Sequence, residues 1–408
     1  MILEGKHIVI GIGSGIAAYK IPELIRLLRK QGAEVKVATT RHALEFVTDL
    51  TLQTLSGHRV YSDVFAAIND HSTEHISLPD WADAMLVAPA TADVLCKMAA
   101  GIADDALTTT LAAMRKPVVV APAMNDKMYA AEALQDALRK LAGRTNMHVL
   151  DCADGFLACG TNGKGRLQEP EVLVEAVRAA LTPQDWQGRQ VLVTCGPTRE
   201  AIDPVRFISN HSTGKMGVAL VSALVAHGAT VRLVAGPMQQ ALNLPLWHPA
   251  MTHYGSCLRT DVTSAAEMYT SATEAWPAAD TAILAAAVAD MTPAEVADHK
   301  MKKGRDNLDT ISLTETQDIA RALGEMKRSD QYLVGFALET DHEQLNALDK
   351  LHKKHLDAIV LNSLRDAGAG FGTDTNIVTI YNAEGCATHI PLADKSSVAE
   401  AILSAISR

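Results

Sequence analysis

The stretch Arg189–Gly217, RQVLVTCGPTREAIDPVRFISNHSTGKMG, decides how the chain is organised. It opens with the apolar run Gln190–Thr194, which is typical of a buried strand, and breaks at Gly196–Pro197. A polar loop then leads into a helical pattern that begins near Lys215. The residues before this stretch already make a complete α/β pattern, and those after it complete a second one. We therefore expect two α/β units in series, with this stretch forming the first half of the second active site.

Composition bounds the possible functions. A chain of 408 residues with 48% hydrophobic residues predicts two domains of ordinary size, each with its own core. The net charge of −10 argues against a nucleic-acid or acidic-membrane partner. Small anionic substrates remain possible, because backbone N–H groups bind phosphate whatever the net charge.

The cysteines and the first residues indicate the compartment. The six cysteines contain no CxxC pair, which argues against a disulfide scaffold or a zinc module. The opening residues MILEGKHIVIGIG run directly into a strand and lack the pattern of a signal peptide, and no apolar run approaches membrane-spanning length. We therefore expect a cytoplasmic protein.

The first half begins with a βαβ pattern. Strand-like runs at His7–Ile12 and Glu34–Thr39 flank a helical pattern at Ile16–Lys30, and glycines recur in Gly11–Gly15. Such a turn usually holds a phosphate at the helix N-terminus, although a plain tight turn is the alternative. Ile16 and Thr39–Thr40 stand where a dinucleotide site needs a small residue and an acidic residue. A mononucleotide phosphate, as in FMN, fits better.

Further apolar strands are expected at 84–88, 117–121 and 147–150, as in a parallel sheet that is buried on both faces. Two of them end in similar turns, Ala88–Thr91 and Ala121–Asn125. In a doubly wound sheet these turns and Gly11–Gly15 face one crevice. Asn125 is therefore a candidate binding residue there, with a helix N-cap as the alternative.

The segment His71–His75 matches the H-x-x-E-H zinc-peptidase pattern. That motif needs a helix, whereas Ile76 and Leu78 alternate with polar residues and Pro79 follows, which predicts extended chain. We expect a single catalytic or surface histidine at position 75 rather than a metal site.

The segment Gly155–Arg166 places four glycines around Cys159. So much glycine predicts a mobile loop that covers an active site and carries a thiol able to donate a proton. The alternative is a surface loop with an incidental cysteine.

The second half follows a linker at Thr182–Trp186. Its segment Ser212–Gly217 fails the P-loop pattern, because Ser209 and Met216 occupy the positions of the first glycine and of the metal-binding hydroxyl. It can still form a phosphate nest at a helix start.

Further on, the apolar run Thr281–Ala289 is expected to be one strand ending at Asp290. The basic cluster Lys300–Lys303 suits a triphosphate, with solvated surface as the alternative. Lys350 and Lys354 lie four residues apart, on one face of the helix expected at 343–355. A hairpin is expected over 376–390 and a closing helix over 394–407.

Together, these motifs resemble the bacterial bifunctional phosphopantothenoylcysteine decarboxylase / phosphopantothenate–cysteine ligase family of coenzyme A synthesis, over essentially the whole chain. The segments that carry the resemblance, in the family's order, are PAMNDKM at 122–128, ACG at 158–160, DPVRFISNHSTGKMG at 203–217, AAAVAD at 285–290, KMKK at 300–303 and GFALET at 335–340.

The resemblance implies two doubly wound, mostly parallel-sheet domains. A flavodoxin-like FMN domain at 1–182 would be followed by a linker at 183–188 and a Rossmann-like ligase domain at 189–408. The second half would couple 4'-phosphopantothenate to cysteine with CTP and Mg²⁺ through an acyl-cytidylate, and the first would decarboxylate the product to 4'-phosphopantetheine. A homo-oligomer is implied, trimeric through the first domain and dimeric through the second.

The resemblance also implies roles for single residues. His75 matches the decarboxylase base, Asn125 and Met128 the residues that clamp the substrate, Cys159 the acid of the lid, and Asn210 the residue that handles the acyl-cytidylate. The FMN-binding positions would be Gly13, Ser14, Gly15, Thr40, Thr91 and Met128. The CTP-binding positions would be Ala285, Ala286, Ala287, Asp290, Lys300, Gln317, Asp318, Ile319, Ala320, Phe336, Lys350 and Lys354, with Mg²⁺ bound mainly through the nucleotide.

The chain departs from the family's pattern at a few positions. Tyr129, Asp93 and Thr213 replace residues of similar shape or chemistry. The segment Pro237–Thr260 is longer than the family pattern needs. Two rival functions remain at this point: a flavin- or nicotinamide-dependent oxidoreductase with a regulatory second domain, and a flavodoxin-like partner-binding protein without catalysis.

Overall fold

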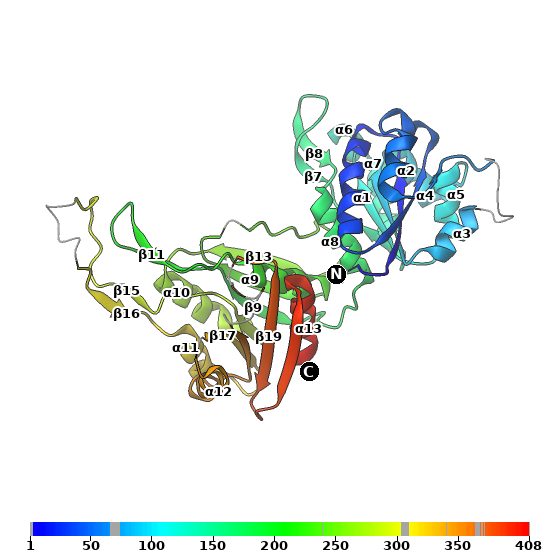
Figure 1. The fold of residues 1–408 in the computed structure, drawn as a ribbon. Coiled ribbons are helices and arrows are strands. Elements are labelled where there is room, and N and C mark those ends of the chain that lie inside the picture. The colour runs from blue at the N-terminus through cyan, green and yellow to red at the C-terminus, as the bar shows by residue number, and fades with distance from the viewer. Residues whose placement is uncertain are drawn as a thin grey trace. The chain divides into compact units, whose positions relative to one another are not determined.

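The structure, a computed structural model, describes residues 3–65, 74–238, 240–302, 310–339, 341–363, 368, 370 and 372–407. His71–Thr73 and Lys303, which entered the sequence interpretation, lie outside these residues. The chain forms two compact units (Figure 1). Unit 1 comprises residues 1–184 and 243–254, and unit 2 comprises 185–242 and 255–408.

Unit 1 contains a six-stranded parallel sheet. The strands in spatial order are β3 (Val60–Tyr61), β2 (Glu34–Thr39), β1 (His7–Ile12), β4 (Ala84–Ala90), β5 (Val118–Pro122) and β6 (Met147–Val149). Apart from the two-residue edge strand β3, this is the order of a flavodoxin-like doubly wound sheet, which confirms the predicted fold class. The strand order reverses between β1 and β4, where a ligand crevice is expected.

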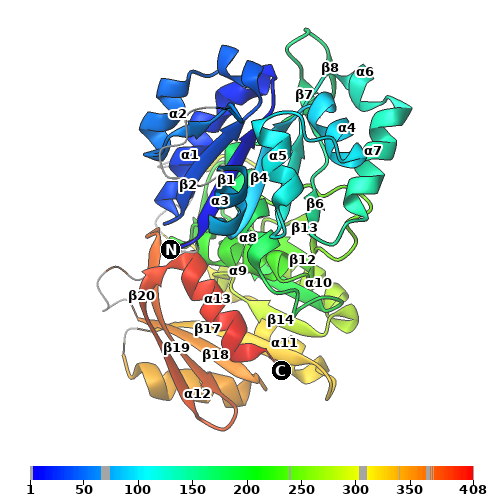
Figure 2. The same cartoon turned by 90° about the vertical axis from the view of Figure 1, so that its right-hand side faces the viewer.

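Helices cover both faces of this sheet (Figure 2). One face packs against α1 (Ile21–Lys30), α2 (Asp49–Ser56) and α8 (Pro170–Leu181). The other packs against α3 (Glu74–Trp81), α4 (Ala92–Ala100), α5 (Ala106–Ala113) and α7 (Glu132–Ala142). The short helix α6 (Asp126–Tyr129) and the hairpin of β7 (Ala153–Phe156) and β8 (Asn162–Arg166) follow the carboxyl ends of β5 and β6.

Two expectations about the helices of unit 1 were wrong. The helix expected over 16–30 is a 3₁₀ turn at Ile16–Lys20 followed by α1, because Pro22 lacks an N–H and fits only in the first turn of a helix. The chain expected to be extended after position 74 is the helix α3. Its burial of Leu78 and Pro79, and the stacking of the Trp81 ring on His7 at 4.5 Å, outweigh the local alternation.

Unit 2 contains an eight-stranded sheet, parallel except for its last two strands. The strands in spatial order are β13 (Ser256–Asp261), β12 (Thr230–Ala235), β9 (Gln190–Cys195), β14 (Thr281–Leu284), β17 (Tyr332–Glu339), β18 (Ala358–Ser363), β19 (Thr375–Asn382) and β20 (Ala387–Asp394). The expected C-terminal hairpin is confirmed as β19–β20. The strand order reverses between β9 and β14.

Helices cover this sheet too. They are α9 (Lys215–Ala226), α10 (Ala265–Ala275), α11 (Ile319–Met326), α12 (Glu343–Lys353) and α13 (Lys395–Ile406), with a 3₁₀ turn at Trp276–Ala278. Two small antiparallel pairs lie outside the sheet: β10 (Arg199–Ala201) with β11 (Phe207–Ser209), and β15 (Met291–Pro293) with β16 (Leu313–Glu315).

The strand expected over 281–289 ends at Leu284 instead. Beyond it, the backbone follows the loop after β9 rather than a neighbouring strand. The N–H groups of Ala285 and Ala287 donate to the carbonyl oxygens of Thr194 and Gly196, and the N–H of Ala289 donates to the hydroxyl of Thr198. The part of the apolar run beyond Leu284 is therefore a loop rather than the end of a strand.

Residues 243–254 have a structural role that the sequence did not reveal, because they belong to unit 1. Trp247 forms an antiparallel bridge with Leu150, just beyond the edge strand β6, and the N–H of His248 donates to the carbonyl oxygen of Val149 at 3.0 Å. The Trp247 and Tyr254 rings stack at 3.7 Å. We call residues 243–254 the strap. It covers the backbone groups that an edge strand would otherwise leave open.

The strap makes unit 1 sensitive to acid. The Tyr254 hydroxyl lies within hydrogen-bond distance of His148 Nδ1, at 2.6 Å. Burial, with a smaller contribution from His253, lowers the pKa of His148 to about 4. The unfolded chain binds this proton near pH 6.5 and the folded unit only near pH 4. Stability is therefore lost as the pH falls through that window, by about 3 kcal/mol for 2.5 pH units.

This loss is measurable by denaturant unfolding of the full chain at pH 7, 6, 5 and 4. His148→Asn, which has an acceptor but does not titrate in this range, should show a shallower decline than the parent. Parallel declines in the two proteins would contradict the assignment to His148.

Candidate functional sites in the two units

A cavity of about 560 Å³ lies at the carboxyl ends of the strands in unit 1. It is lined by the turns after β1, β4 and β5 and by the β7–β8 hairpin, which confirms that the turns face one crevice. The expected binding residues that line it are Ser14, Gly15, Thr91, Asn125, Met128 and Cys159.

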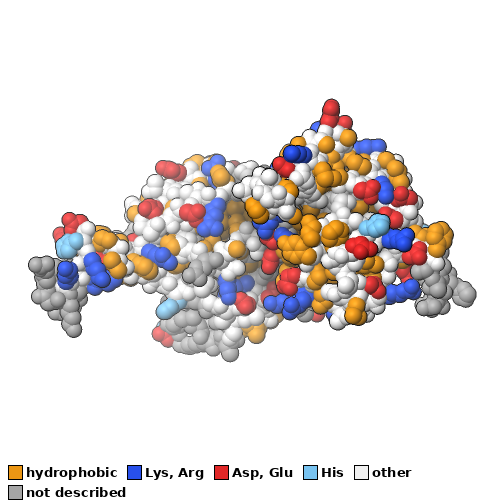
Figure 3. Space-filling model, turned by 90° about the horizontal axis from the view of Figure 1, so that it is seen from above, with side chains coloured by type: hydrophobic (Ala, Val, Ile, Leu, Met, Phe, Trp, Pro, Cys, Tyr) orange, Lys and Arg blue, Asp and Glu red, His pale blue; other side chains and the backbone are white. Residues whose placement is uncertain are grey.

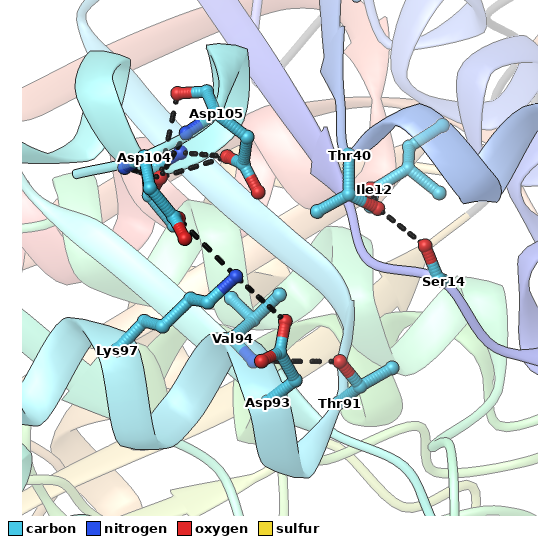
Figure 4. A network of polar contacts seen from close by, with 10 residues as sticks. Ile12, Ser14, Thr40, Thr91, Asp93, Val94, Lys97, Asp104 and Asp105 are labelled. Carbon is cyan, nitrogen blue, oxygen red and sulfur yellow. Dashed lines mark hydrogen bonds and ion pairs between the residues drawn. The ribbon is translucent and has the colours of Figure 1, made fainter. Parts of the chain in front are cut away.

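The turn after β1 has the features of a phosphate cradle. The Gly13 N–H donates to the Pro89 carbonyl at 3.1 Å, and a Cβ on Gly13 would lie 2.6 Å from that oxygen, so no side chain fits there. The hydroxyls of Ser14 and Thr40 lie 2.7 Å apart (Figure 4). The buried Thr39 hydroxyl has no hydrogen-bond partner within the described chain. These groups fit the phosphate and polar edge of a mononucleotide.

The turn after β4 is held by its own polar contacts. The Thr91 hydroxyl caps α4, and Lys97 bridges the carboxylates of Asp93 and Asp104 at 3.2 Å each (Figure 4). The Thr91 backbone is thereby fixed against Gly15, where a Cβ would lie 3.2 Å from the Thr91 methyl group.

Asn125 caps α6, which was the alternative interpretation, and it also lines the cavity. Its Oδ1 accepts from the Lys127 N–H at 2.9 Å, so it caps α6, and its Nδ2 donates to Cys159 Sγ at 3.3 Å. The Thr161 hydroxyl lies 3.2 Å from the same sulfur. The hydrogen bond from Thr161, together with that from Asn125, lowers the pKa of the Cys159 thiol. The expected glycine-rich loop is a β7–β8 hairpin with this thiol near its tip.

Three expected residues of this site do not line the cavity: Gly13 and Thr40, which lie at the ends of β1 and β2, and His75. His75 lies on α3. By contrast, Ile16 and Tyr19 do line it, and their side chains remain 56% and 62% exposed. Figure 3 shows one face of the molecule on which hydrophobic side chains gather in patches.

Unit 2 carries a cavity of about 430 Å³ where its strand order reverses. Lys350 on α12 and Lys354, the residue that follows this helix, line it and are ion-paired: Lys350 with Glu339 at 2.6 Å and Lys354 with Asp318 at 2.9 Å. Most of the residues expected to contact CTP line this cavity: Ala286, Asp290, Gln317, Asp318, Ile319, Ala320, Phe336, Lys350 and Lys354.

Asp318 joins the cavity to the start of α11. Burial opposes its ionisation, but the N–H of Arg321 and the ammonium of Lys354 lower the pKa of this carboxyl below its usual value. A carboxylate that stays ionised keeps Lys354 at the cavity wall.

A second cavity, of about 210 Å³, adjoins the first. Both are lined by Ala286, Val288 and Phe336. The second also contains Ala285 and Ala287 and the start of α9 at Ser212–Gly217. The arrangement can hold a nucleotide beside a second, anionic substrate.

Asn210 and Lys300 line neither cavity. Asn210 is nevertheless adjacent, because its Nδ2 donates to the Ala287 carbonyl and its Oδ1 accepts from the Ser212 N–H at 3.1 Å. Lys300 is exposed, and the next residue, Met301, is held by Asp203 and Arg206.

Several lining residues had no sequence signal. Glu315 and Thr316 enter the nucleotide-sized cavity because β16 pairs with β15 outside the main sheet. Lys395 and Asn376 enter the smaller cavity because the C-terminal hairpin returns α13 beside α9. These placements depend on long-range pairing, which no local motif records.

The described residues contain neither a cluster of possible metal ligands nor a helix able to span a membrane. Among the described residues, no group of three or more His, Cys, Asp or Glu side chains is arranged to hold a metal ion. No described helix is both long and apolar enough to cross a membrane.

The fold and the two crevices define a tandem α/β enzyme of the flavoprotein class, and comparison with known proteins agrees. Residues 2–182 match the family model described as "Flavoprotein", and residues 186–408 match "DNA/pantothenate metabolism flavoprotein C-terminal domain". The "Coenzyme A biosynthesis bifunctional protein CoaBC" of Bacillus subtilis (strain 168) is 45% identical over 407 residues, 99% of this chain and 97% of that protein.

The protein of the same name from Escherichia coli (strain K12) is 39% identical over 409 residues, 100% of this chain and 98% of that one. A crystal structure of the C-terminal domain of such a protein covers 55% of this chain and 96% of that one, with 39% identity and a TM-score of 0.45. The chain therefore belongs to the family of bifunctional coenzyme A biosynthesis proteins, and acts as a decarboxylase and a ligase. Neither rival function is retained.

Proposed function

We propose that unit 2 joins 4'-phosphopantothenate to cysteine with CTP, and that unit 1 decarboxylates the product to 4'-phosphopantetheine with FMN. The observation that supports this most is the pair of unlike crevices. One brings a thiol and an amide together beside a glycine turn, and the other places two lysines, each ion-paired with an acid, at a nucleotide-sized cavity with a largely polar lining. Omitting CTP, cysteine or the phosphorylated acid in turn tests it, since each omission should abolish product.

The ligase reaction must activate a carboxylate, which is a poor acyl donor. Its oxygen attacks the α-phosphorus of CTP, pyrophosphate leaves, and the cysteine amine then displaces CMP from the acyl-cytidylate. We propose that Lys350 and Lys354, with Lys300 from the neighbouring loop, balance the triphosphate charge together with Mg²⁺ carried by the nucleotide. Asn210, fixed at Ala287 between the two cavities, would orient the acyl group.

FMN suits the cavity of unit 1, because Ser14 and Gly15 in the turn after β1 and Thr91 in the turn after β4 line it at the carboxyl ends of the strands. When bound, it would supply reversible removal of hydride from the CH₂–SH group, so that the carboxylate is lost beside a C=S bond rather than from an unstabilised carbanion. His75 would take the thiol proton, Asn125 would hold the substrate carboxylate, and Cys159 would return a proton to the enethiol.

We further propose that His75 reaches this site from a second copy of the chain. The support is the absence of His75 from the cavity of its own chain, together with the exposed Ile16 and Tyr19 at the cavity wall. A ring of three copies would cover these side chains and give each site one histidine from a neighbour.

Mixed oligomers test this proposal. His75→Asn and Cys159→Ala should each fail to form the saturated thiol alone. Co-expression with two different tags should restore about one quarter of the parent activity, because random assembly leaves that share of interfaces with both groups intact. No recovery in doubly tagged, flavin-containing oligomers would place His75 outside the shared site.

A further inference from the structure

Asp151 is a buried carboxylate that the proposed chemistry does not use. It follows β6 and is 6% exposed. It accepts three hydrogen bonds: from the Cys152 N–H at 2.9 Å, from Lys164 Nζ at 2.5 Å, and from the Tyr129 hydroxyl. A buried charge with this many donors is held firmly in one place.

The two side chains bound to Asp151 come from the two elements that carry Asn125 and Cys159. Tyr129 ends α6, the helix that Asn125 caps. Lys164 lies on β8, the strand that follows Cys159 in the hairpin. Asp151 therefore connects α6 with the hairpin, and the 3.3 Å contact between Asn125 Nδ2 and Cys159 Sγ connects them a second time.

The base of the hairpin is tightly packed. The Met124 N–H donates to the Gly165 carbonyl at 2.9 Å, and a Cβ on Gly165 would lie 2.3 Å from the Met124 oxygen. Near the tip, Phe156 is 70% exposed and Gly160 adopts a φ of +87°. Any movement of the hairpin therefore pivots about the part that Asp151 holds.

The strap in turn fixes Asp151. The Asp151 N–H donates to the Leu246 carbonyl at 2.8 Å. Gln168 Nε2 donates to the carbonyls of both Asp151 and Leu246, at 2.8 and 2.7 Å. The Leu246 N–H completes the set by donating to Gln168 Oε1 at 3.0 Å. The strap thus satisfies the Asp151 N–H, and Gln168, which is itself bound to Leu246 of the strap, satisfies the Asp151 carbonyl.

We propose that Asp151 is a positioning residue for decarboxylation: it holds the Asn125 helix and the Cys159 hairpin at a fixed separation, so that the thiol meets substrate held by Asn125. Asp151 itself does not line the cavity. The inference rests on the proposed function of unit 1, because it takes Cys159 as the proton donor of the last step.

The first test needs no catalysis. In the full chain, the pH dependence of Cys159 alkylation by iodoacetamide is followed by peptide mass spectrometry, which separates it from the exposed Cys96 and Cys386. Asp151→Asn should move the midpoint for Cys159 to higher pH, because the contact with Asn125 is lost. Simple removal of a nearby negative charge would move it to lower pH, so the direction distinguishes the two effects.

The matched control is Asp154→Asn, which removes an exposed carboxylate from β7 of the same hairpin. It should not raise the midpoint. If Asp151→Asn behaves like this control, the proposal is overturned.

The second test reads the products. Per flavin-containing enzyme, Asp151→Asn should raise the ratio of enethiol to saturated thiol by up to about 10²-fold, the effect of displacing a reacting group by about 1 Å. A merely structural role would lower the amount of folded enzyme but leave this ratio unchanged. If Asp151→Asn does not fold, Lys164→Met removes only the ion pair between the hairpin and Asp151 and should raise the same ratio. An unchanged ratio overturns the proposal.

The proposed roles of Cys159 and Asp151 can be contradicted separately. If Cys159→Ala forms the saturated thiol normally, the proposed role of Cys159 is wrong, whatever the alkylation data show. If Cys159→Ala accumulates the enethiol while Asp151→Asn matches the parent in both tests, only the role of Asp151 is wrong.

Discussion

Cys159→Ala should slow formation of the saturated thiol by about 10²–10⁴-fold, the usual effect of removing one proton donor from its step. Loss of CO₂ should continue, because it precedes the step that needs this proton. The variant should therefore release or retain the enethiol. The structure supports this separation, since the thiol lies near the tip of a hairpin and, among the described residues, its sulfur is bound by Asn125 and Thr161.

Quenched reactions analysed by mass spectrometry, with CO₂ measured in parallel, distinguish the possibilities. His75→Asn is the comparison variant and should yield neither CO₂ nor enethiol. Normal amounts of the saturated thiol from Cys159→Ala would make Cys159 an incidental residue of the hairpin.

The second large effect concerns Lys300 and Asn210, which should fail at different steps. Lys300→Gln should lower formation of the acyl-cytidylate by about 10²–10³-fold, the usual effect of removing one electrostatic stabiliser of a transition state. Asn210→Asp should still form some intermediate but transfer it poorly to cysteine, because a second carboxylate would stand where an amide orients the acyl oxygen.

Rapid quench with labelled CTP, in the absence and presence of cysteine, measures the two steps separately. Asn210→Asp should accumulate intermediate when cysteine is present, whereas Lys300→Gln should show little under either condition. Equal absence of intermediate in both variants would contradict this division. Arg321→Gln removes an exposed cation outside both cavities and serves as the matched control for charge.

The sequence predicted the local parts of this fold because each has a local cause. The strand His7–Ile12, the helix starting at Lys215 and the hairpin over Asn376–Ile390 follow from apolar runs, glycine breaks and turn residues. Where the sequence misled, a distant contact decided. Glu74–Trp81 is helical because Trp81 stacks on His7, and the run after Leu284 leaves the sheet to follow the loop after β9.

The residues of the candidate sites also fall into those with a local cause and those placed by distant contacts. Ser14, Thr91 and Asn125 were predictable because they end parallel strands on both sides of a reversal in strand order. Asp151 was not, because its role exists only when Tyr129 and Lys164 are folded onto it. The strap could not be assigned from sequence either, because nothing local indicates that Trp247 pairs with Leu150 nearly a hundred residues earlier.

The measurement that most directly tests whether one chain performs both reactions is a coupled stoichiometry. Purified protein is incubated with 4'-phosphopantothenate, cysteine, CTP and Mg²⁺, and pyrophosphate, CO₂ and 4'-phosphopantetheine are quantified together. The account predicts equal amounts of all three, with pyrophosphate but no CO₂ from Asn125→Ala, and neither pyrophosphate nor CO₂ when CTP is omitted. Formation of 4'-phosphopantetheine without CTP, pyrophosphate release without the phosphorylated acid, or continued pyrophosphate release over many turnovers without cysteine, would contradict it.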